Sequence, residues 1–262
     1  MSEQPNVKIY VCHHKNSPRY QNESLIPIWA GKAISNEVMD GEIIGDDTLD
    51  NISAKNKTYC EMTVLYWMWK NVEADYYGLF HYRRLLNFNR AVTDFHFAQF
   101  DEETINKFGW HSERIKEVCE QYDIISSGLI NVFRIDYPEY LFTNYEQYSH
   151  SHNSKDIDIA MSIIKEKYPE MYPASLRWLH SKDAFYCNML IMKKEYFHPY
   201  CAWLFDVLFE LEKRLDISHY DDYQKRAVAF LSERLANCYM AYLQEKESNL
   251  RYTQRDIVYG TF

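Results

Sequence analysis

Residues 75–84 have the sequence Asp-Tyr-Tyr-Gly-Leu-Phe-His-Tyr-Arg-Arg, in which a short apolar run passes directly into basic side chains. The run is rich in aromatic residues and flanked by polar ones, which indicates a short buried strand. In open α/β sheets, ligands bind outside the carboxyl ends of the strands. We therefore expect His81, Arg83 and Arg84 to face a ligand.

Further strand patterns lie on both sides of this run. Residues 7–12 alternate and include β-branched side chains, as a first strand does. Residues 122–126 and 185–192 are also strand-like. These segments provide the strands of one sheet.

Helices are predicted between the strands. Thr58 and Glu61 form a capping-box pattern ahead of spaced apolar residues, so a helix should begin near Tyr59. The alternation of strands and helices predicts an α/β fold with a mostly parallel central sheet flanked by helices. Other helical patterns occupy residues 111–121, 145–167, 195–215 and 222–244.

Length and composition fit one globular domain. The chain has 262 residues, 47% of them hydrophobic, which is enough for one substantial core or two small ones. It contains no internal repeat, low-complexity tract or linker. Residues 1–262 are therefore interpreted as a single domain.

Charge, cysteines and hydropathy narrow the class of protein. The formal net charge is −9 and the 29 Lys and Arg are scattered, so no basic stripe is available for nucleic acid. Six widely separated cysteines are typical of reduced thiols. Residues 1–15 lack a leader pattern, and no apolar run reaches the roughly 18 residues that cross a bilayer. We expect a cytoplasmic protein.

Two segments suit an anionic ligand. Guanidinium groups form forked, charge-assisted hydrogen bonds with phosphate oxygens, which suits Arg83 and Arg84 for a diphosphate. The alternative for this pair is an ordinary surface ion pair. Residues 51–57 place Lys55 and Lys57 before a predicted helix N-terminus, where free N–H groups favour an anion. The alternative for this segment is a solvated loop with a good cap.

Seven strings of the sequence form a pattern that is specific only when taken together. They are Ile-Tyr-Val-Cys-His-His-Lys (9–15), Asp-Asp-Thr-Leu-Asp-Asn-Ile-Ser-Ala-Lys-Asn (46–56), Tyr-Cys-Glu (59–61), Tyr-Trp-Met-Trp-Lys-Asn (66–71), Gly-Leu-Phe-His-Tyr-Arg-Arg (78–84), Asn-Met-Leu-Ile-Met-Lys-Lys (188–194) and Phe-Leu-Ser-Glu-Arg-Leu (230–235). With these strings the chain resembles, nearly end to end, a family of bacterial capsule and O-antigen (lipopolysaccharide) biosynthesis proteins. That family was long described as a domain of unknown function and includes galactofuranosyltransferases.

The resemblance implies a GT-A-like nucleotide-diphospho-sugar transferase fold, with a nucleotide-sugar half at about 1–130 and an acceptor half at about 131–262. It implies a hexosyltransferase that moves a sugar, first of all galactofuranose, from a UDP-sugar donor to a lipid-linked or oligosaccharide acceptor during the synthesis of surface polysaccharide. The residues that it suggests near the donor and its diphosphate are Asn51, Ser53, Lys55, Asn56, His81, Arg83, Arg84 and Asn188.

Residues for the acceptor and for proton transfer are sought in the second half. Tyr148 and His152 suit the orientation of an acceptor hydroxyl, although a plain surface helix is equally compatible with their segment. A transferase that inverts configuration needs one carboxylate that takes the proton of the acceptor hydroxyl. Asp183, Asp222 and Glu233 are the catalytic candidates, and the sequence does not choose among them.

The metal pattern of most GT-A enzymes is missing. They have Asp-x-Asp at the end of the strand that we assign to residues 76–80, where two carboxylates hold Mn²⁺ or Mg²⁺. This chain has His-Tyr-Arg at 81–83 instead. We therefore predict that fixed positive charge replaces the metal and that no cofactor is needed. The alternative is Mn²⁺ or Mg²⁺ held by Asp46, Asp47 or Asp222.

Two other classes of protein remain as alternatives. A metal-dependent phosphodiesterase or hydrolase would use His13, His14, His81, Asp46 and Asp47, although their spacing matches no compact metal motif. A non-catalytic sugar-binding protein would explain the 16% aromatic content.

The helix predicted at residues 195–215 has a broad apolar face. Such a face usually packs into the core, and the alternative is peripheral contact with the inner membrane at its cytoplasmic face.

Overall fold

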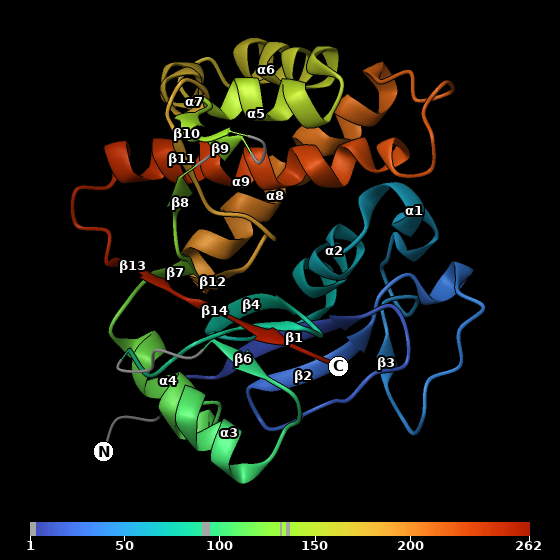
Figure 1. Ribbon diagram of the computed structural model, residues 1–262, viewed down its shortest axis with the longest axis vertical. Helices are drawn as coiled ribbons and strands as arrows, with labels where there is room; N and C mark the ends of the chain where they lie inside the picture. The colour runs from blue at the N-terminus through green and yellow to red at the C-terminus, as the bar shows by residue number, and fades with distance from the viewer. Residues whose placement is uncertain (1–3, 91–94, 132, 135–136) are drawn as a thin grey trace.

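The computed structural model describes residues 4–90, 95–131, 133–134 and 137–262, and its centre is a twisted mixed sheet (Figure 1). The strands run across this sheet in the order β13-β7-β12-β4-β1-β2-β3. Their bounds are β1 (Val7–His13), β2 (Leu25–Trp29), β3 (Ile44–Gly45), β4 (Tyr76–His81), β7 (Ile124–Ser127), β12 (Leu190–Lys193) and β13 (Tyr252–Arg255).

Most neighbouring strands of the sheet are parallel. β1 pairs in parallel with both β2 and β4, β2 with β3, and β13 with β7. β12 runs antiparallel to its neighbours β4 and β7. The predicted α/β fold with a mostly parallel sheet is therefore confirmed, with one reversed strand. Because β12 is reversed, the residues before it lie at the same edge as the carboxyl ends of β1 and β4.

Shorter strands extend the sheet and form small pairs beside it. β5 (Arg84–Leu86) pairs with β4 and with β14 (Ile257–Gly260), and β14 also pairs with β6 (His96–Phe97). The small pairs join β8 (Ile130–Asn131) to β11 (Asp183–Ala184) and β9 (Phe133–Arg134) to β10 (Tyr137–Leu141).

Helices cover both faces of the sheet (Figure 1). One face packs on α3 (Glu102–Phe108) and α4 (Ser112–Glu120), and the other on α2 (Met62–Asn71), α8 (Lys194–Arg214) and α9 (Ala227–Lys246). Side chains of β1 alternate between these two cores, as a strand with period two requires. Outside α8 and α9 lie α5 (Asn144–Ser151), α6 (Ser154–Lys167) and α7 (Tyr172–Leu179).

The apolar face of α8 is buried. Phe197, Trp203, Leu204 and Leu208 are each at most 5% exposed. The core interpretation of this helix is therefore confirmed, and these apolar side chains are not available to a membrane because they pack against the sheet and the neighbouring helices. No helix of the described residues is both long enough and apolar enough to cross a bilayer.

Two predicted helices differ from the structure. Residues 145–167 form two helices because Asn153 begins a second one, accepting a hydrogen bond from the Lys155 N–H. The capping box of Thr58 and Glu61 is wrong. The chain forms η2 (Ser53–Lys55) and α1 (Asn56–Tyr59) and then breaks at Cys60, whose φ is 46°, before α2 begins.

The last predicted helix starts late. A 3₁₀ turn, η3 (Gln224–Arg226), precedes α9, just as η1 (Lys32–Ile34) follows β2. Arg226 of η3 lines the first pocket described next, and Lys32 of η1 lines the second pocket.

Candidate functional site

A pocket of about 510 Å³ opens at the carboxyl ends of β1 and β4, and His81, Arg83 and Arg84 are among the residues that line it. We call it the strand-end pocket. It draws side chains from the start of the chain, from α1, from the β4–β5 turn, from the loop before β12 and from α9. Its lining residues are Cys12, His14, Ala30, Asn56, Lys57, Cys60, Glu61, His81, Tyr82, Arg83, Arg84, Cys187, Arg226 and Glu233.

Basic side chains dominate this pocket although the chain carries a net charge of −9. Arg83 and Arg84 have no carboxylate partner within the described part of the chain, and the Arg83 guanidinium lies 5.3 Å from the centre of the Tyr82 ring. Lys57 and Arg226 enter from α1 and η3. Several fixed positive charges in one hollow make it suited to an anion such as a diphosphate.

Two carboxylates face these cations. Glu233 accepts a hydrogen bond from the Cys187 N–H at 2.9 Å and pairs with the buried Arg234 at 2.8 Å. Burial raises the pKa of Glu233, the negative charge of Glu61 raises it further, and Arg234 opposes both effects. Among Asp183, Asp222 and Glu233, only Glu233 lines the pocket.

The sequence did not predict Glu61 as a site residue, because its spacing from Thr58 resembled a capping box. Instead, its Oε1 accepts a hydrogen bond from Asn188 Nδ2 at 2.8 Å. The same Nδ2 donates to Ser232 Oγ at 3.0 Å. Asn188 is only 4% exposed and lies outside the lining of the strand-end pocket. It therefore positions Glu61 from behind.

Unusual backbone conformations surround the two carboxylates. Cys60, Cys187 and Asn188 have φ values of 46°, 72° and 51°, a region that residues with a side chain rarely adopt. His81 Nε2 donates to the Cys187 carbonyl at 2.7 Å, which ties the end of β4 to this loop. Strained residues cluster at functional sites more often than elsewhere, so this geometry supports a ligand site here.

The loop that precedes α1 is organised by one buried acid. Asp46 is fully buried, and its carboxylate accepts from the N–H groups of Gly31 and Lys32 and from the hydroxyls of Ser53 and Thr63. Ser53 is therefore committed to holding the loop. All of these contacts are internal, and they leave Asp46 no oxygen directed at the strand-end pocket.

The other residues of this loop that were predicted to lie near the sugar donor do not share one position. Asn56 lines the strand-end pocket and donates to the Cys60 carbonyl at 2.8 Å. Asn51 bonds to its own loop through Leu49 and Ser53. Lys55 pairs with Glu212 of α8 at 2.6 Å and is absent from the pocket lining.

The remaining predicted site residues lie apart from this pocket. Asp183 is exposed on β11, and the Asp222 side chain is 99% exposed beside Lys225. Tyr148 is fully buried, which leaves it no surface for an acceptor. His152 is half-buried and stacks on Phe230 at 4.2 Å.

The two histidines after β1 have different surroundings. His13 is 2% exposed, and its Nδ1 lies 2.9 Å from Ser17 Oγ. Burial, with the positive charge of Arg19, lowers the pKa of His13 to about 4. His14 is exposed and lines the strand-end pocket. His13 is therefore a neutral core residue. Within the described ranges, no group of three or more His, Cys, Asp or Glu side chains is arranged to hold a metal.

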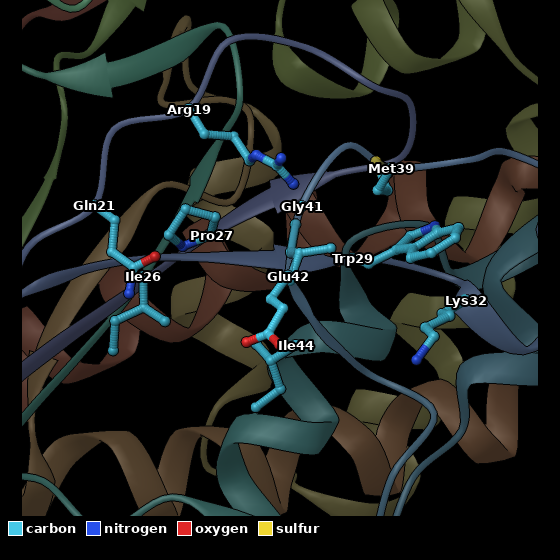
Figure 2. A pocket seen from close by; sticks show the side chains of 11 residues that line it. Arg19, Gln21, Ile26, Pro27, Trp29, Lys32, Met39, Gly41, Glu42 and Ile44 are labelled. Carbon is cyan, nitrogen blue, oxygen red and sulfur yellow. The ribbon is translucent and has the colours of Figure 1, made fainter.

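A second pocket, of about 700 Å³, lies at the β2 edge of the sheet, and we call it the edge pocket (Figure 2). It and the strand-end pocket share the turn after β2. Ala30 lines the strand-end pocket, whereas Trp29 and Lys32 line the edge pocket.

Comparisons with known proteins agree with this fold. The solved apo structure of WbbM, a bifunctional glycosyltransferase, is similar to this chain with a TM-score of 0.91 and 34% sequence identity, over 98% of this chain and 46% of that one. The present chain thus spans about half the length of that structure. No curated protein matches. The family model described as a domain of unknown function, DUF4422, matches residues 8–246, so the chain belongs to the DUF4422 family.

Proposed function

We propose that this chain is a glycosyltransferase whose nucleotide-diphosphate sugar donor binds in the strand-end pocket. The observation that carries the proposal is the meeting of Arg83, Arg84 and Glu233 in one pocket at the carboxyl ends of β1 and β4. UDP-galactofuranose is the donor that we propose first. The acceptor is a saccharide, free or lipid-linked, and the product is surface polysaccharide.

The cations hold the diphosphate. Arg83 and Arg84 form no ion pair with the described carboxylates, and Lys57 and Arg226 add charge from the other walls. Guanidinium donors stabilise the negative charge that develops on a leaving phosphate. We propose that they do so here without a divalent metal, because the position of the usual Asp-x-Asp is held by His-Tyr-Arg at 81–83.

Glu233 is the base in this proposal. Its carboxylate takes the proton of the acceptor hydroxyl while the acceptor oxygen forms a bond to the anomeric carbon of the donor sugar. The bond from that carbon to the phosphate oxygen breaks, and its electron pair leaves with UDP. A raised pKa makes Glu233 a stronger base than an ordinary glutamate.

The likeness to WbbM supports transferase activity, since that protein is described as a bifunctional glycosyltransferase. This chain corresponds to 46% of it. The assignment of one activity to this portion is our proposal.

Calorimetric titration with UDP tests the proposal, in buffer alone, with Mn²⁺ and after EDTA. We expect binding that survives EDTA, followed by release of UDP from UDP-galactofuranose when acceptor is supplied. UDP-galactopyranose is the matched control for the sugar. Binding only with Mn²⁺ contradicts metal independence, and failure to bind UDP under all three conditions contradicts the transferase assignment.

A further inference from the structure

The edge pocket is a built feature of the sheet edge. β3 pairs with β2 only at Ile28 and Trp29, although β2 begins at Leu25. The next residue back along β2 is Pro27, which has no N–H to donate to a further strand. The sheet therefore stops pairing at this point, and the pocket has Ile26 and Pro27 on its floor.

Two loops are fastened together over this floor. Asn16 Nδ2 donates to the Asp40 carboxylate at 2.5 Å, and the Asp40 N–H donates to Asn16 Oδ1 at 3.2 Å. Arg19 Nη2 donates to the Asp40 carbonyl. Gly41 follows with a φ of 65°, which suits glycine, and a Cβ at this residue would lie 3.8 Å from Arg19 Nη2. The loops thus hold the guanidinium against the pocket.

Two buried donors of this pocket have no partner. Arg19 Nη1 and Trp29 Nε1 are buried and bond to no described residue. Figure 2 shows both side chains among those that line the pocket. An unsatisfied buried donor destabilises the protein, and a ligand with acceptor oxygens would remove that penalty. The half-buried Trp29 ring adds an apolar surface next to those donors.

The lining favours a neutral ligand. Arg19 and Lys32 are matched by Glu42 in the lining and by Asp47, which lies 3.5 Å from Lys32. A strongly anionic group would meet the Glu42 carboxylate, and Asp47 already offsets the charge of Lys32. Sugar residues combine neutral hydroxyl oxygens with apolar ring faces, and about 700 Å³ falls within the size range of small-molecule sites.

We propose that the edge pocket binds sugar units of a neutral oligosaccharide acceptor. This inference rests on the proposed transferase function, because the turn after β2 places the pocket beside the donor site. Trp29 packs against a sugar ring and donates from Nε1, and Arg19 donates from Nη1 to a second hydroxyl.

The probes are maltotriose and β-1,4-galactotriose, with binding followed by saturation-transfer NMR and UDP binding measured in parallel by calorimetry. We expect wild-type protein to bind at least one trisaccharide with UDP present. Trp29→Phe and Arg19→Gln should each weaken that binding by about fivefold to tenfold, as loss of one hydrogen bond does. Both variants should bind UDP normally, which also shows that they are folded. Arg177→Gln, at an exposed ion pair with Glu245, is the matched control.

Three results overturn the inference. If wild-type protein binds UDP but neither trisaccharide, the edge pocket is not a saccharide site and the transferase proposal stands. If trisaccharide binding persists unchanged in both variants, the sugars bind elsewhere. If the variants lose UDP affinity instead, the pocket belongs to the donor nucleotide.

Discussion

Arg83 and Arg84 differ in their surroundings from the ion-paired arginines of this chain. Arg177 pairs with Glu245 and Arg251 with Asp123, whereas the two arginines after β4 have no such partner among the described residues. An unpaired guanidinium in a pocket keeps its donors available for phosphate. The proposed diphosphate site depends on this difference.

Arg83→Ala and Arg84→Ala should each lower kcat/KM on the order of 10²-fold, since each removes a group that stabilises charge on the leaving diphosphate. Steady-state kinetics with the UDP-sugar donor measure the effect. Arg177→Ala should leave turnover unchanged because its ion pair is on the surface. Near-normal kinetics in both pocket variants would remove the diphosphate assignment.

Glu233→Gln should abolish most turnover while UDP binding is retained, because the amide cannot accept the proton. In the wild type, a raised pKa keeps Glu233 protonated to a higher pH than an ordinary glutamate. The active carboxylate form is therefore lost as pH falls through that raised pKa, so the acid limb of kcat/KM should lie at a higher pH than an ordinary glutamate would give. Asp183→Asn and Asp222→Asn are the controls and should have wild-type rates. Loss of rate in either control variant instead would assign the catalytic base to that residue.

At the scale of elements, β4 sets the geometry of the strand-end pocket. Gly78 lies in register between Ile9 of β1 and Ile191 of β12. A Cβ at this residue would lie 2.8 Å from Ile9 Cγ1 and 3.1 Å from Ile191 Cγ1. Glycine is therefore required here by packing. The side chains of the two isoleucines occupy the space beside Gly78. The pairing of β4 with β1 and β12 then places His81, at the end of β4, in the pocket.

Gly78→Ala should lower the free energy of unfolding by about 1–3 kcal/mol, the usual cost of overfilling a core. Urea denaturation measures it. Gly128→Ala is the matched control, because the nearest atom to its added Cβ lies at 3.7 Å, an ordinary contact. A partial recovery is expected when Ile9→Val accompanies Gly78→Ala. Equal stability of the Gly78 and Gly128 variants would contradict the packing argument.

The break between α1 and α2 is the second feature at this scale. Cys60 interrupts what the capping pattern predicted as one helix, and Glu61 then turns toward Asn188. A continuous helix would place Glu61 elsewhere on its surface. The local pattern predicted a helix correctly, but long-range hydrogen bonding decided where it begins.

At the scale of the whole molecule, charge is distributed unevenly. The chain carries a net charge of −9, whereas Lys57, Arg83, Arg84 and Arg226 converge in one pocket that also contains the carboxylates of Glu61 and Glu233. An excess of positive charge in a hollow with a low dielectric concentrates the electric field. The pocket is therefore the part of this acidic surface that attracts an anion.

UDP affinity should consequently fall as salt rises from roughly 0.05 to 0.5 M, because the Debye length shortens from above to below about 10 Å over that range. Calorimetric titration in NaCl gives the slope. Arg83→Ala should reduce the slope, since one screened charge is gone, whereas Arg177→Ala should not. An affinity that is independent of salt would contradict an electrostatic site.

The sequence by itself determined the α/β fold and one half of the proposed site. The strand at residues 75–80 is visible because its pattern is local, and the end of a strand in an open sheet is a ligand position by geometry. Arg83 and Arg84 follow that strand directly along the chain. No long-range contact was needed to place them at the sheet edge.

Only the tertiary structure decided which carboxylates join those cations. Glu61 follows α1 and Glu233 lies on α9, and the packing of α9 against α1 and against the loop before β12 brings them together. The tertiary structure also buries Tyr148 and exposes Asp222. It places Asp46 where its carboxylate holds the loop before α1 through hydrogen bonds. Burial and pairing depend on contacts between distant segments, and these contacts set the pKa of a carboxylate. The periodicity of a single segment contains no information about them.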